Sequence, residues 1–511
     1  MSADPEPTVL PLDHLALRGD PDADALVLRD RVLSYKELNR RIGALAAWLC
    51  AQVPDPGARI ATWLPKTEIA CLMPLAAVRA GLVHVPVNPL LKRAQVAHII
   101  GDCGAAMLVS NKARLATLEA GDAAQAIVVE EGEARNAVDA ATEILPPSGE
   151  TADRLAAILY TSGSTGRPKG VMLSNANLWL GAASVAGYLG VGPHDRTLAV
   201  LPFAFDYGQN QLLSTWYAGG AVVPLDYLMP RDVVKAVAKH AITTLAAVPP
   251  LWVQLVEQDW PQDAAGSLRR LTNSGGALTP DLVRALRTLF PAADLYPMYG
   301  LTEAFRSTYL DPSLVDTHPT SIGKAIPFAE IMVVADSGKE AAPGEEGELV
   351  HAGPLVAQGY WQDAERTAER FRPAPPWSRH GGLAVWSGDR VRRDGDGLLY
   401  FVGRRDAMIK TSGNRVSPQE VEDAAVATGL VAEAVAIGVA DPALGQAIHL
   451  VARASGDPAK AEAGLVPALT RMLPNFMVPR MVHWRQAMPI GPNGKIDRVA
   501  LAAQLREQVN A

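Results

Sequence analysis

The chain has 511 residues, 49% of them hydrophobic and 20% charged, which is ordinary for a globular protein of more than one domain and argues against disorder. Its formal net charge of -7 gives no overall basic surface, so the composition does not indicate nucleic-acid binding. The cysteines Cys50, Cys71 and Cys103 form no close CxxC pair, which argues against a disulfide framework or a zinc site and fits the reducing cytoplasm.

The segments that could indicate secretion or a membrane lack the required patterns. Residues 1–8 are acidic and proline-bearing, without the apolar core of a secretory signal. The apolar stretch Ala70–Leu91 contains Arg79 and several prolines, so we expect a buried helix followed by a strand, with no membrane span.

The first part of the chain alternates between helix and strand patterns. We expect strands at Ala25–Leu28, Val32–Ser34, Arg59–Trp63, Val83–Val87 and Ala106–Val109, and helices at Tyr35–Leu49, Lys66–Gly81 and Gln95–Asp102. This alternation is typical of a layered α/β domain with a largely parallel sheet. The acidic segment Val129–Ala152 is predicted to be an exposed connection.

A glycine-rich loop follows the buried strand predicted at Leu155–Leu159. Residues 159–170 read Leu-Tyr-Thr-Ser-Gly-Ser-Thr-Gly-Arg-Pro-Lys-Gly, and the apolar run Val171–Leu173 follows, so the loop joins two strands. Gly163 and Gly166 can adopt positive φ and direct backbone N–H groups at one anion. The side chains that add hydroxyl donors or charge are Thr161, Ser162, Ser164, Thr165 and Lys169. The loop is not a Walker A loop, because the spacing to the lysine differs and no helix follows.

A polar surface turn is the simpler reading of such residues, but their density around one lysine favours a phosphate site. The block resembles the signature loop of the adenylate-forming superfamily, which includes acyl-CoA synthetases, adenylation domains of peptide synthetases and luciferases. The resemblance implies that this loop binds the β- and γ-phosphates of ATP. It also implies an α/β fold: a large N-terminal layered domain with mixed, mostly parallel sheets and a β-rich subdomain, plus a small, mobile α+β C-terminal domain.

The segment after the predicted helix Asn175–Leu189 and strand Leu198–Pro202 bears on the substrate. The resemblance places the start of the carboxylate pocket at Phe205, Asp206 and Tyr207. Amino-acid-activating members tend to carry an aspartate after a phenylalanine, and Asp206 resembles it; a buried ammonium needs such a counter-charge. An aspartate after a strand is equally often a turn residue or a helix cap, so both interpretations stay open.

Two further blocks follow the predicted helix Val233–His240 and strand Thr243–Val248. The strand and glycine turn at Leu271–Gly276 resemble the segment that passes over the adenine, which assigns Ser274, Gly275 and Gly276 to the nucleotide. Asp294–Glu303 ends in Tyr299, Gly300, Leu301, Thr302 and Glu303. An aromatic ring can stack on a purine, a threonine hydroxyl can bond a phosphate oxygen and a glutamate can hold Mg²⁺, and the resemblance implies these roles.

We expect the next stretch to be mainly structural. Gly347–Trp361 resembles another family block, whose glycines we interpret as turns in the β-rich subdomain. Asp389 is expected just before a β-hairpin with its turn at Asp394–Gly397. The resemblance implies that Asp389 accepts both ribose hydroxyls; the alternative is a surface ion pair with Arg390.

The resemblance divides the chain into an N-terminal AMP-binding domain, residues 1–404, and a C-terminal lid domain, residues 405–511, with the hinge at Asp406. Arg404 would approach the nucleotide. In the lid we expect a capping box at Ser417–Glu420 opening a helix through Val426, strands at Ala432–Val439 and Ile448–Ala454, and helices at Ala459–Leu473 and Arg498–Val509. Lys495 follows Asn-Gly and alone would be a solvated turn residue, but the resemblance makes it the adenylation lysine.

The resemblance implies a two-step reaction. A carboxylate first attacks the α-phosphorus of ATP, giving an acyl-adenylate and pyrophosphate, with Lys495 bridging carboxylate and phosphate, Thr302 on the α-phosphate, Lys169 on the outer phosphates and Glu303 on Mg²⁺. The lid then swings about Asp406, and Gly413 lets a pantetheine arm pass so that its thiol attacks the adenylate.

Three readings of the substrate and activity remain. Asp206 favours a small amino acid loaded onto a separate carrier protein. The alternative is an acyl-CoA synthetase for a small, medium or aryl acid, because coenzyme A and a holo carrier protein present the same pantetheine thiol. A remote alternative is a non-catalytic sensor that binds nucleotide.

Overall fold

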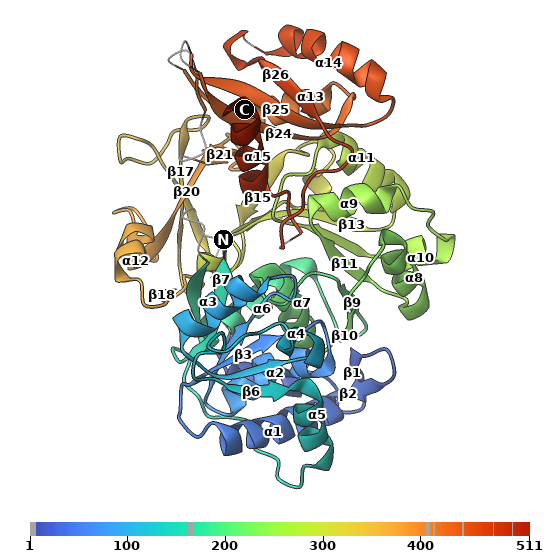
Figure 1. The fold of residues 1–511 in the computed structure, drawn as a ribbon, viewed down its shortest axis with the longest axis vertical. Helices are drawn as coiled ribbons and strands as arrows, with labels where there is room; N and C mark the ends of the chain where they lie inside the picture. Colours follow the sequence, from blue (N-terminus) through green and yellow to red (C-terminus); the bar gives the residue numbers. More distant parts are fainter. Residues whose placement is uncertain are drawn as a thin grey trace.

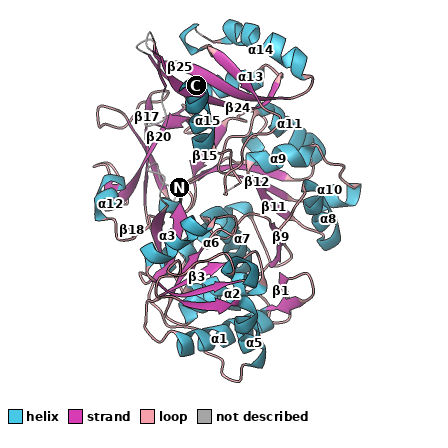
Figure 2. Cartoon of the chain, viewed as in Figure 1, coloured by secondary structure: helices cyan, strands magenta, loops and turns pink. Residues whose placement is uncertain are grey.

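The computed structural model describes residues 7–161, 168–404, 409–411, 414–441, 444–473, 475–492 and 494–510. Two sheets with their helices form the large N-terminal part, and a smaller C-terminal unit, red in Figure 1, lies against it. Figure 2 shows that helices and strands are interleaved through the N-terminal part, as the alternating sequence pattern predicts. The α/β fold with a small C-terminal α+β unit is confirmed.

The first sheet carries the glycine-rich loop. Its seven strands, in spatial order, are β18 (Gly359–Tyr360), β8 (Lys169–Ser174), β7 (Leu155–Thr161), β4 (Val83–Pro86), β3 (Arg59–Trp63), β5 (Ala105–Ser110) and β6 (Ile127–Glu130). The strands from β7 to β6 are parallel, whereas β8 and β18 are antiparallel additions at one edge. The β7–β8 hairpin predicted around the loop is therefore present.

The second sheet joins the β-rich subdomain to the α/β layer. Its strands run in the order β16 (Glu330–Val334), β17 (Glu346–Ala352), β20 (Leu383–Arg393), β21 (Leu399–Arg404), β15 (Ser321–Ala325), β14 (Thr308–Tyr309), β13 (Asp294–Tyr299), β12 (Arg270–Asn273), β11 (Thr244–Ala247), β9 (Arg196–Ala199), β10 (Ala221–Pro224), β1 (Asp24–Val27) and β2 (Val32–Ser34), with β19 (Phe371–Pro373) paired to β20. Pairing is parallel from β1 to β13 and antiparallel from β13 to β16. Site residues from both halves are thus brought to one sheet.

The helices of the N-terminal part cover these sheets. They are η1 (Leu12–Leu17), α1 (Tyr35–Gln52), α2 (Glu68–Arg79), α3 (Arg93–Cys103), α4 (Lys112–Leu115), α5 (Glu131–Ala140), α6 (Asn175–Leu189), α7 (Asp206–Tyr217), α8 (Pro230–His240), α9 (Pro249–Val256), α10 (Gln262–Ser267), α11 (Pro280–Leu289), η2 (Thr302–Ala304), η3 (Pro312–Leu314) and α12 (Ala364–Arg370). The start of α6 is fixed by Ser174 and Asn177, each side chain accepting from the other's backbone N–H. Gly190 ends α6 at φ 61°.

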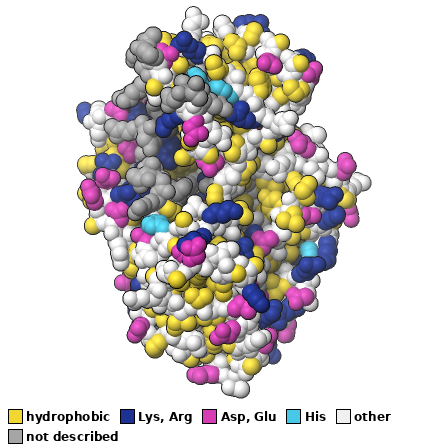
Figure 3. Space-filling model, in the orientation of Figure 1, with side chains coloured by type: hydrophobic (Ala, Val, Ile, Leu, Met, Phe, Trp, Pro, Cys, Tyr) yellow, Lys and Arg dark blue, Asp and Glu magenta, His cyan; other side chains and the backbone are white. Residues whose placement is uncertain are grey.

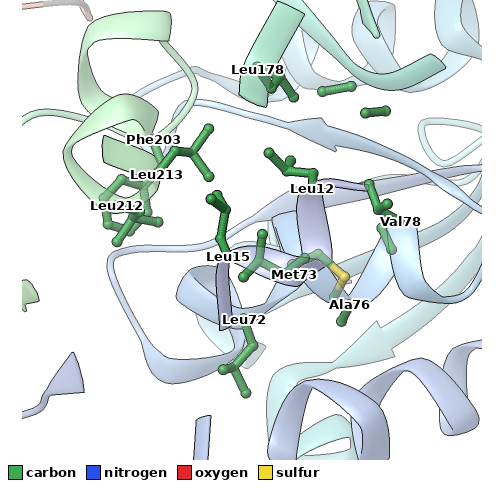
Figure 4. Packing of buried hydrophobic residues seen from close by; sticks show 14 of the residues in the cluster. Leu12, Leu15, Leu72, Met73, Ala76, Val78, Leu178, Phe203, Leu212 and Leu213 are labelled. Atoms are coloured by element: carbon green, nitrogen blue, oxygen red, sulfur yellow. The ribbon is translucent and has the colours of Figure 1, made fainter. Parts of the chain in front are cut away.

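The main hydrophobic core lies between η1, α2 and α7. Figure 4 shows Leu12 and Leu15 of η1 among Leu72 and Met73 of α2 and Leu212 of α7, and these side chains are buried. Burying one such side chain contributes about 1.5–3 kcal/mol. The core therefore anchors α7, whose first residue belongs to the candidate site.

The prediction of an exposed connection at Val129–Ala152 was wrong for much of its length. Residues 131–140 form α5, which packs on α1, and Ala134 and Val138 are fully buried. Their four-residue spacing is the helical signal that the acidic composition obscured. Only the part after α5 lacks regular structure.

The C-terminal unit is built on one sheet. Its elements are β22 (Ile409–Thr411), β23 (Asn414–Val416), α13 (Pro418–Ala427), β24 (Val431–Asp441), β25 (Gly445–Ala454), α14 (Pro458–Met472), η4 (Asn475–Met477), β26 (Met481–Trp484) and α15 (Arg498–Asn510). The predicted capping box at Ser417 was wrong, because the Ser417 hydroxyl donates to the Val402 carbonyl and makes no cap bond to the helix. Ser417 instead ties the unit to β21.

Candidate active site

The structure describes both ends of the glycine-rich loop, at Thr161 and at Lys169. Thr161 closes β7 opposite Lys169 of β8 in the antiparallel register. The Thr161 hydroxyl has no hydrogen-bond partner within the described ranges, so it can accept a contact from a ligand. The predicted phosphate-binding residues Ser162, Gly163, Ser164, Thr165 and Gly166 lie outside the described residues, as do Asp406 and Gly413.

Lys169, Glu303 and Tyr360 form one hydrogen-bonded cluster beside the loop. The Lys169 ammonium donates to Glu303 Oε1 at 3.1 Å and to the Tyr360 hydroxyl oxygen at 2.5 Å, and Tyr360 donates to the same Oε1 at 2.6 Å. Burial raises the pKa of Glu303, but the Lys169 charge and the Tyr360 hydrogen bond outweigh burial and lower it. Glu303 is therefore an anion at neutral pH.

The contacts of Tyr360 correct our purely structural reading of Gly347–Trp361. Tyr360 comes from β18, which pairs with β8 and so brings the tyrosine beside Lys169. Arg370, at the end of α12, interacts electrostatically with Glu303 and Tyr360. Burial lowers the pKa of Arg370, but Glu303, Tyr360 and Asp389 together raise it above its usual value. The cluster therefore has two cations, Lys169 and Arg370, around one carboxylate.

Asp389 lies inside β20 rather than just before a hairpin, which corrects the predicted position. It pairs with Arg404 across β20 and β21, with Arg404 Nε 3.3 Å from Asp389 Oδ1. The Tyr299 hydroxyl donates to Asp389 Oδ2 at 2.5 Å. Arg390 pairs with Asp336 at 2.7 Å, so the alternative of an Asp389–Arg390 ion pair was wrong. Burial and the adjacent Asp389 raise the pKa of Tyr299, which therefore stays protonated.

The glycine turn after β12 approaches the lysine of the C-terminal unit. Gly275 has φ 83°, and a Cβ built on it would lie 2.4 Å from Lys495 Cε. Only glycine tolerates both this backbone conformation and this approach. Neighbouring Ser274 accepts a hydrogen bond from Arg306 Nη1 at 3.0 Å, and Gly276 accepts from Asn273 at 2.9 Å.

The loop that carries Lys495 is held against the N-terminal part. Asn88 donates to the Pro492 carbonyl at 2.5 Å, and Gly491 N–H donates to the Lys495 carbonyl at 2.7 Å. Desolvation by the surrounding protein lowers the pKa of Lys495; Asp206 opposes this, and Arg306 adds to it. In this arrangement the two parts of the chain contribute to one site.

Asp206 begins α7 and contacts two residues of the segment that follows β13. It accepts a hydrogen bond from the Thr302 hydroxyl at 3.1 Å and lies 3.6 Å from the Arg306 guanidinium. Phe205 is the cap residue of α7 and forms no side-chain cap bond. The Tyr207 hydroxyl bonds Thr272 at 2.7 Å. Asp206 is thus a helix-start residue that also faces the site.

A small cavity is lined by Tyr207, the residue after Asp206, and by Arg306. Its volume is about 30 Å³, space for roughly two water molecules. Residues of α6, α7, β11, β12 and β13 line it, among them Val185, Tyr207, Asn210, Thr244, Met298 and Arg306. Its position beside Tyr207 matches the place where the sequence resemblance puts the carboxylate pocket.

Comparison with protein families identifies the chain. The family model described as "AMP-binding enzyme" matches residues 14–361, and the one described as "AMP-binding enzyme C-terminal domain" matches residues 420–495. This chain belongs to the AMP-binding enzyme family. It is accordingly an AMP-forming carboxylate–thiol ligase that binds ATP.

Relatives of this AMP-binding enzyme differ in substrate. The L-proline–[L-prolyl-carrier protein] ligase of Pseudomonas fluorescens is 31% identical and aligns over 95% of this chain and 97% of its own length. Feruloyl-CoA synthase of an Amycolatopsis species is 32% identical over 94% and 95%. The crystal structure of ATP-bound MatB from Rhodopseudomonas palustris, at 27% identity, superposes with a TM-score of 0.87 over 98% of this chain and 100% of that one.

The AMP-binding enzyme carries a carboxylate that fits the Mg²⁺ expected with ATP. Proteins hold nucleotide-bound Mg²⁺ through one or two carboxylates and the phosphates. Glu303 is 7% exposed, and the hydrogen bonds from Lys169 and Tyr360 both fall on Oε1. The Glu303 carboxylate is the kind of oxygen ligand that Mg²⁺ takes, and the adjacent cations Lys169 and Arg370 suit the phosphate oxygens that would complete its coordination.

Sequence reasoning missed Tyr360, Arg370, Asn88 and Arg306. Arg306 follows Glu303 by three residues, and a charged residue so close to a nucleotide block was the available signal. Asn88 ends an apolar strand and gave no signal. Within the described ranges no helix is long and apolar enough to cross a bilayer. On the face drawn in Figure 3 acidic and basic side chains are interspersed, without a large area of one sign.

Proposed function

We propose that this ligase adenylates a carboxylic acid that has no α-ammonium group and transfers the acyl group to a pantetheine thiol. The observation that carries the proposal is the Arg306 guanidinium 3.6 Å from the Asp206 carboxylate. Asp206 thus already has an internal cation as its partner, which lowers its need for a substrate ammonium group. This favours the acyl or aryl acid alternative over the amino acid that the sequence first suggested.

The charge balance around Asp206 supports this choice. Asp206 faces Arg306 and also interacts electrostatically with Lys495. A substrate ammonium would be a third cation beside one carboxylate, and an uncompensated buried charge is costly. A simple carboxylate adds one negative charge and improves the balance.

The proposed first step follows from the cluster geometry. Lys495 neutralises the repulsion between the incoming carboxylate and the α-phosphate, and the Thr302 hydroxyl donates to the α-phosphate. Lys169, turning from Glu303, binds the outer phosphates. When bound at Glu303, Mg²⁺ would neutralise further phosphate charge.

A second group of residues would bind the ribose and the adenine of the nucleotide. Asp389 would accept the ribose hydroxyls, with Arg404 and the Tyr299 hydroxyl fixing the carboxylate orientation. The turn Ser274–Gly276 and Gly300 would lie along the adenine, with the Tyr299 ring beside it. The resemblance implies these roles, and the contacts of Asp389 with Arg404 and Tyr299 are compatible with them.

The second step, thioester formation, requires Lys495 to move out of the site. We propose a lid of residues 405–511 turning about Asp406, which would break the Asn88–Pro492 hydrogen bond and withdraw Lys495 from Gly275. Gly413 would then face the pantetheine arm. Coenzyme A and a separate holo carrier protein both supply that thiol chemistry.

A second candidate is an amino acid carrier-protein ligase. It is favoured by the position of Asp206 at the start of α7 and by the 31% identity to the prolyl-carrier protein ligase. In that case the Arg306 contact would have to lengthen when the amino acid binds.

Pyrophosphate exchange into ATP distinguishes the two candidates. The assay uses a panel of fatty, aryl and amino acids with wild type, Asp206→Ala and, as a control, Asp263→Ala at the exposed start of α10. We expect exchange with simple acids to persist in Asp206→Ala, at a reduced rate because the buried Arg306 guanidinium loses its counter-charge. Exchange with a single amino acid that collapses only in Asp206→Ala would establish the second candidate. No exchange with any acid would contradict both and favour a non-catalytic sensor.

A further inference from the structure

Arg306 has an unused pair of hydrogen-bond donors. Its side chain is among the largest fully buried ones, 1% exposed, and its Nη1 donates to Ser274. Nε and Nη2 are buried without a hydrogen-bond partner among the residues that the structure describes. Asp206 Oδ2, 3.6 Å from Nη2, is beyond hydrogen-bond distance. Buried donors without partners are rare and call for an explanation.

The two donors have the geometry of a ligand site. Nε–H and Nη2 lie on one edge of the planar guanidinium and point in parallel, the arrangement that binds two oxygens or one bifurcated oxygen. Two contacts fix the orientation of the guanidinium group. Nη1 donates a hydrogen bond to the Ser274 hydroxyl, and the guanidinium carbon lies 4.7 Å from the centre of the Tyr207 ring. The donor edge is therefore oriented before any ligand binds.

The backbone just before Arg306 has a strained conformation, which sets the direction in which the Arg306 side chain leaves the chain. Phe305 has φ 59° and ψ -56°, and Arg306 N–H donates to the Ala304 carbonyl at 2.6 Å, which defines a γ-turn of the rare, unfavourable hand. The fully buried Phe305 ring fills the space above Gly181, where a Cβ would lie 2.2 Å from the ring. Such strain persists where packing enforces it and is typical of functional positions.

The cavity in front of Arg306 is small and partly polar. Arg306 lines it together with Asn210 and Thr244. Asn210 Oδ1 and Thr244 Oγ1 are also buried without hydrogen-bond partners within the described ranges. A hydrocarbon chain would leave all of these groups unpaired, which is unfavourable, whereas an oxygen-bearing group would pair them.

We propose that the small cavity lined by Arg306 takes the terminal oxygen-bearing group of a short acid, a hydroxyl, carbonyl or second carboxylate, which accepts hydrogen bonds from Nε–H and Nη2 of Arg306. The inference rests on the proposed function and narrows its substrate class. Arg306 then does two things: its charge balances Asp206, and its free edge selects the acyl group. Sites built to bond a substrate oxygen reject the analogue that lacks it by large factors.

The first test compares acids of equal chain length in pyrophosphate exchange. Butanoate is compared with 3-hydroxybutanoate and succinate, and propanoate with lactate and malonate. We expect an oxygenated acid to exceed its unsubstituted partner about a hundredfold or more in kcat/KM. The better of the hydroxy acid and the diacid identifies the charge of the acceptor. Equal or better exchange with butanoate or propanoate overturns this inference but leaves the proposed function standing. Exchange with amino acids alone, or with no acid, overturns both.

The second test changes the donor edge. Arg306→Met removes the donors at similar volume, and Arg306→Lys keeps a charge beside Asp206 without the fork, which guards against misfolding of the first variant. Arg284→Met, on the exposed face of α11, is the matched control. We expect both Arg306 variants to lose about a hundredfold more in kcat/KM for the oxygenated acid than for the unsubstituted acid, so that the preference between the two acids collapses. A parallel fall for both acids would mean a structural role and overturn the inference.

Discussion

Lys495 of the C-terminal unit lies against Gly275 of the N-terminal part, so closely that a Cβ at Gly275 would be 2.4 Å from Lys495 Cε. Together with the Asn88–Pro492 hydrogen bond, this contact puts the lysine loop inside the site formed by Asp206, Thr302 and Asp389. The arrangement corresponds to the first half-reaction of the proposed cycle.

Replacing Lys495 should separate the two half-reactions. In Lys495→Ala we expect pyrophosphate exchange to fall by about a thousandfold or more, because a charge aimed at the transition state is lost. Thioester formation from a preformed adenylate should stay within a fewfold of wild type, since the proposed second step withdraws this lysine. Lys460→Ala, on exposed α14, is the control. Equal losses in both assays would contradict the two-conformation proposal.

The pH dependence of adenylation should report the perturbed lysine. Desolvation lowers the pKa of Lys495 from the model-compound value of 10.5, so the ammonium loses its proton at a lower pH than a free lysine does. We expect kcat/KM for pyrophosphate exchange to fall as pH rises through this lowered pKa. In Lys495→Arg, whose side chain stays charged, the residual activity should lack this alkaline fall. The same fall in Lys495→Arg would assign it to another group.

Tyr360 should act through its two neighbours. Tyr360→Phe removes the hydroxyl that bridges Lys169 and Glu303, and a hydrogen bond to a charged group contributes about 1.5–3 kcal/mol. We expect kcat/KM for ATP to fall about tenfold or more, with a higher Mg²⁺ concentration required for half-maximal rate. Tyr217→Phe, at the other end of α7 from Asp206, is the control. An unchanged Mg²⁺ dependence would limit Tyr360 to a packing role.

Local sequence patterns predicted the strands and loops that carry the site, but not the contacts between segments that are far apart in the sequence. The hairpin around the glycine-rich loop was visible because apolar runs flank the glycines, and β7 and β8 pair there. Tyr360 is 191 residues from Lys169 in sequence, and its role depends on β18 adding to the sheet edge beside β8. No periodicity or propensity in Gly359–Trp361 encodes that pairing, so the segment was read as structural.

Asp206 illustrates the same limit within the pocket. The sequence identified it as a site residue and left open whether it bonds a substrate ammonium or starts a helix. Its Arg306 partner is distant in sequence and reaches the pocket only through the γ-turn at Phe305, a backbone conformation that residue type does not predict. The capping box failed for a similar reason, because the Val402 carbonyl competes for the Ser417 hydroxyl.

The packing that enforces the γ-turn should be measurable as stability. In Gly181→Ala the new Cβ would lie 2.2 Å from the Phe305 ring, so the ring must move, and we expect a loss of about 1–3 kcal/mol in the free energy of unfolding. Gly187→Ala is the matched control on the same helix, because a Cβ there meets nothing within 4 Å. That substitution should stabilise α6 slightly, since alanine favours helix over glycine by about 1 kcal/mol.

A second substitution tests the cause. Adding Phe305→Leu to Gly181→Ala replaces the ring with a smaller branched side chain and should recover part of the lost stability, measured as the coupling energy of a double-mutant cycle in urea unfolding. If Phe305 holds Arg306 in place, Gly181→Ala should also lower the preference for the best acid over its closest analogue. Full stability and unchanged acid preference in Gly181→Ala would mean that the Phe305 turn adapts freely and does not position Arg306.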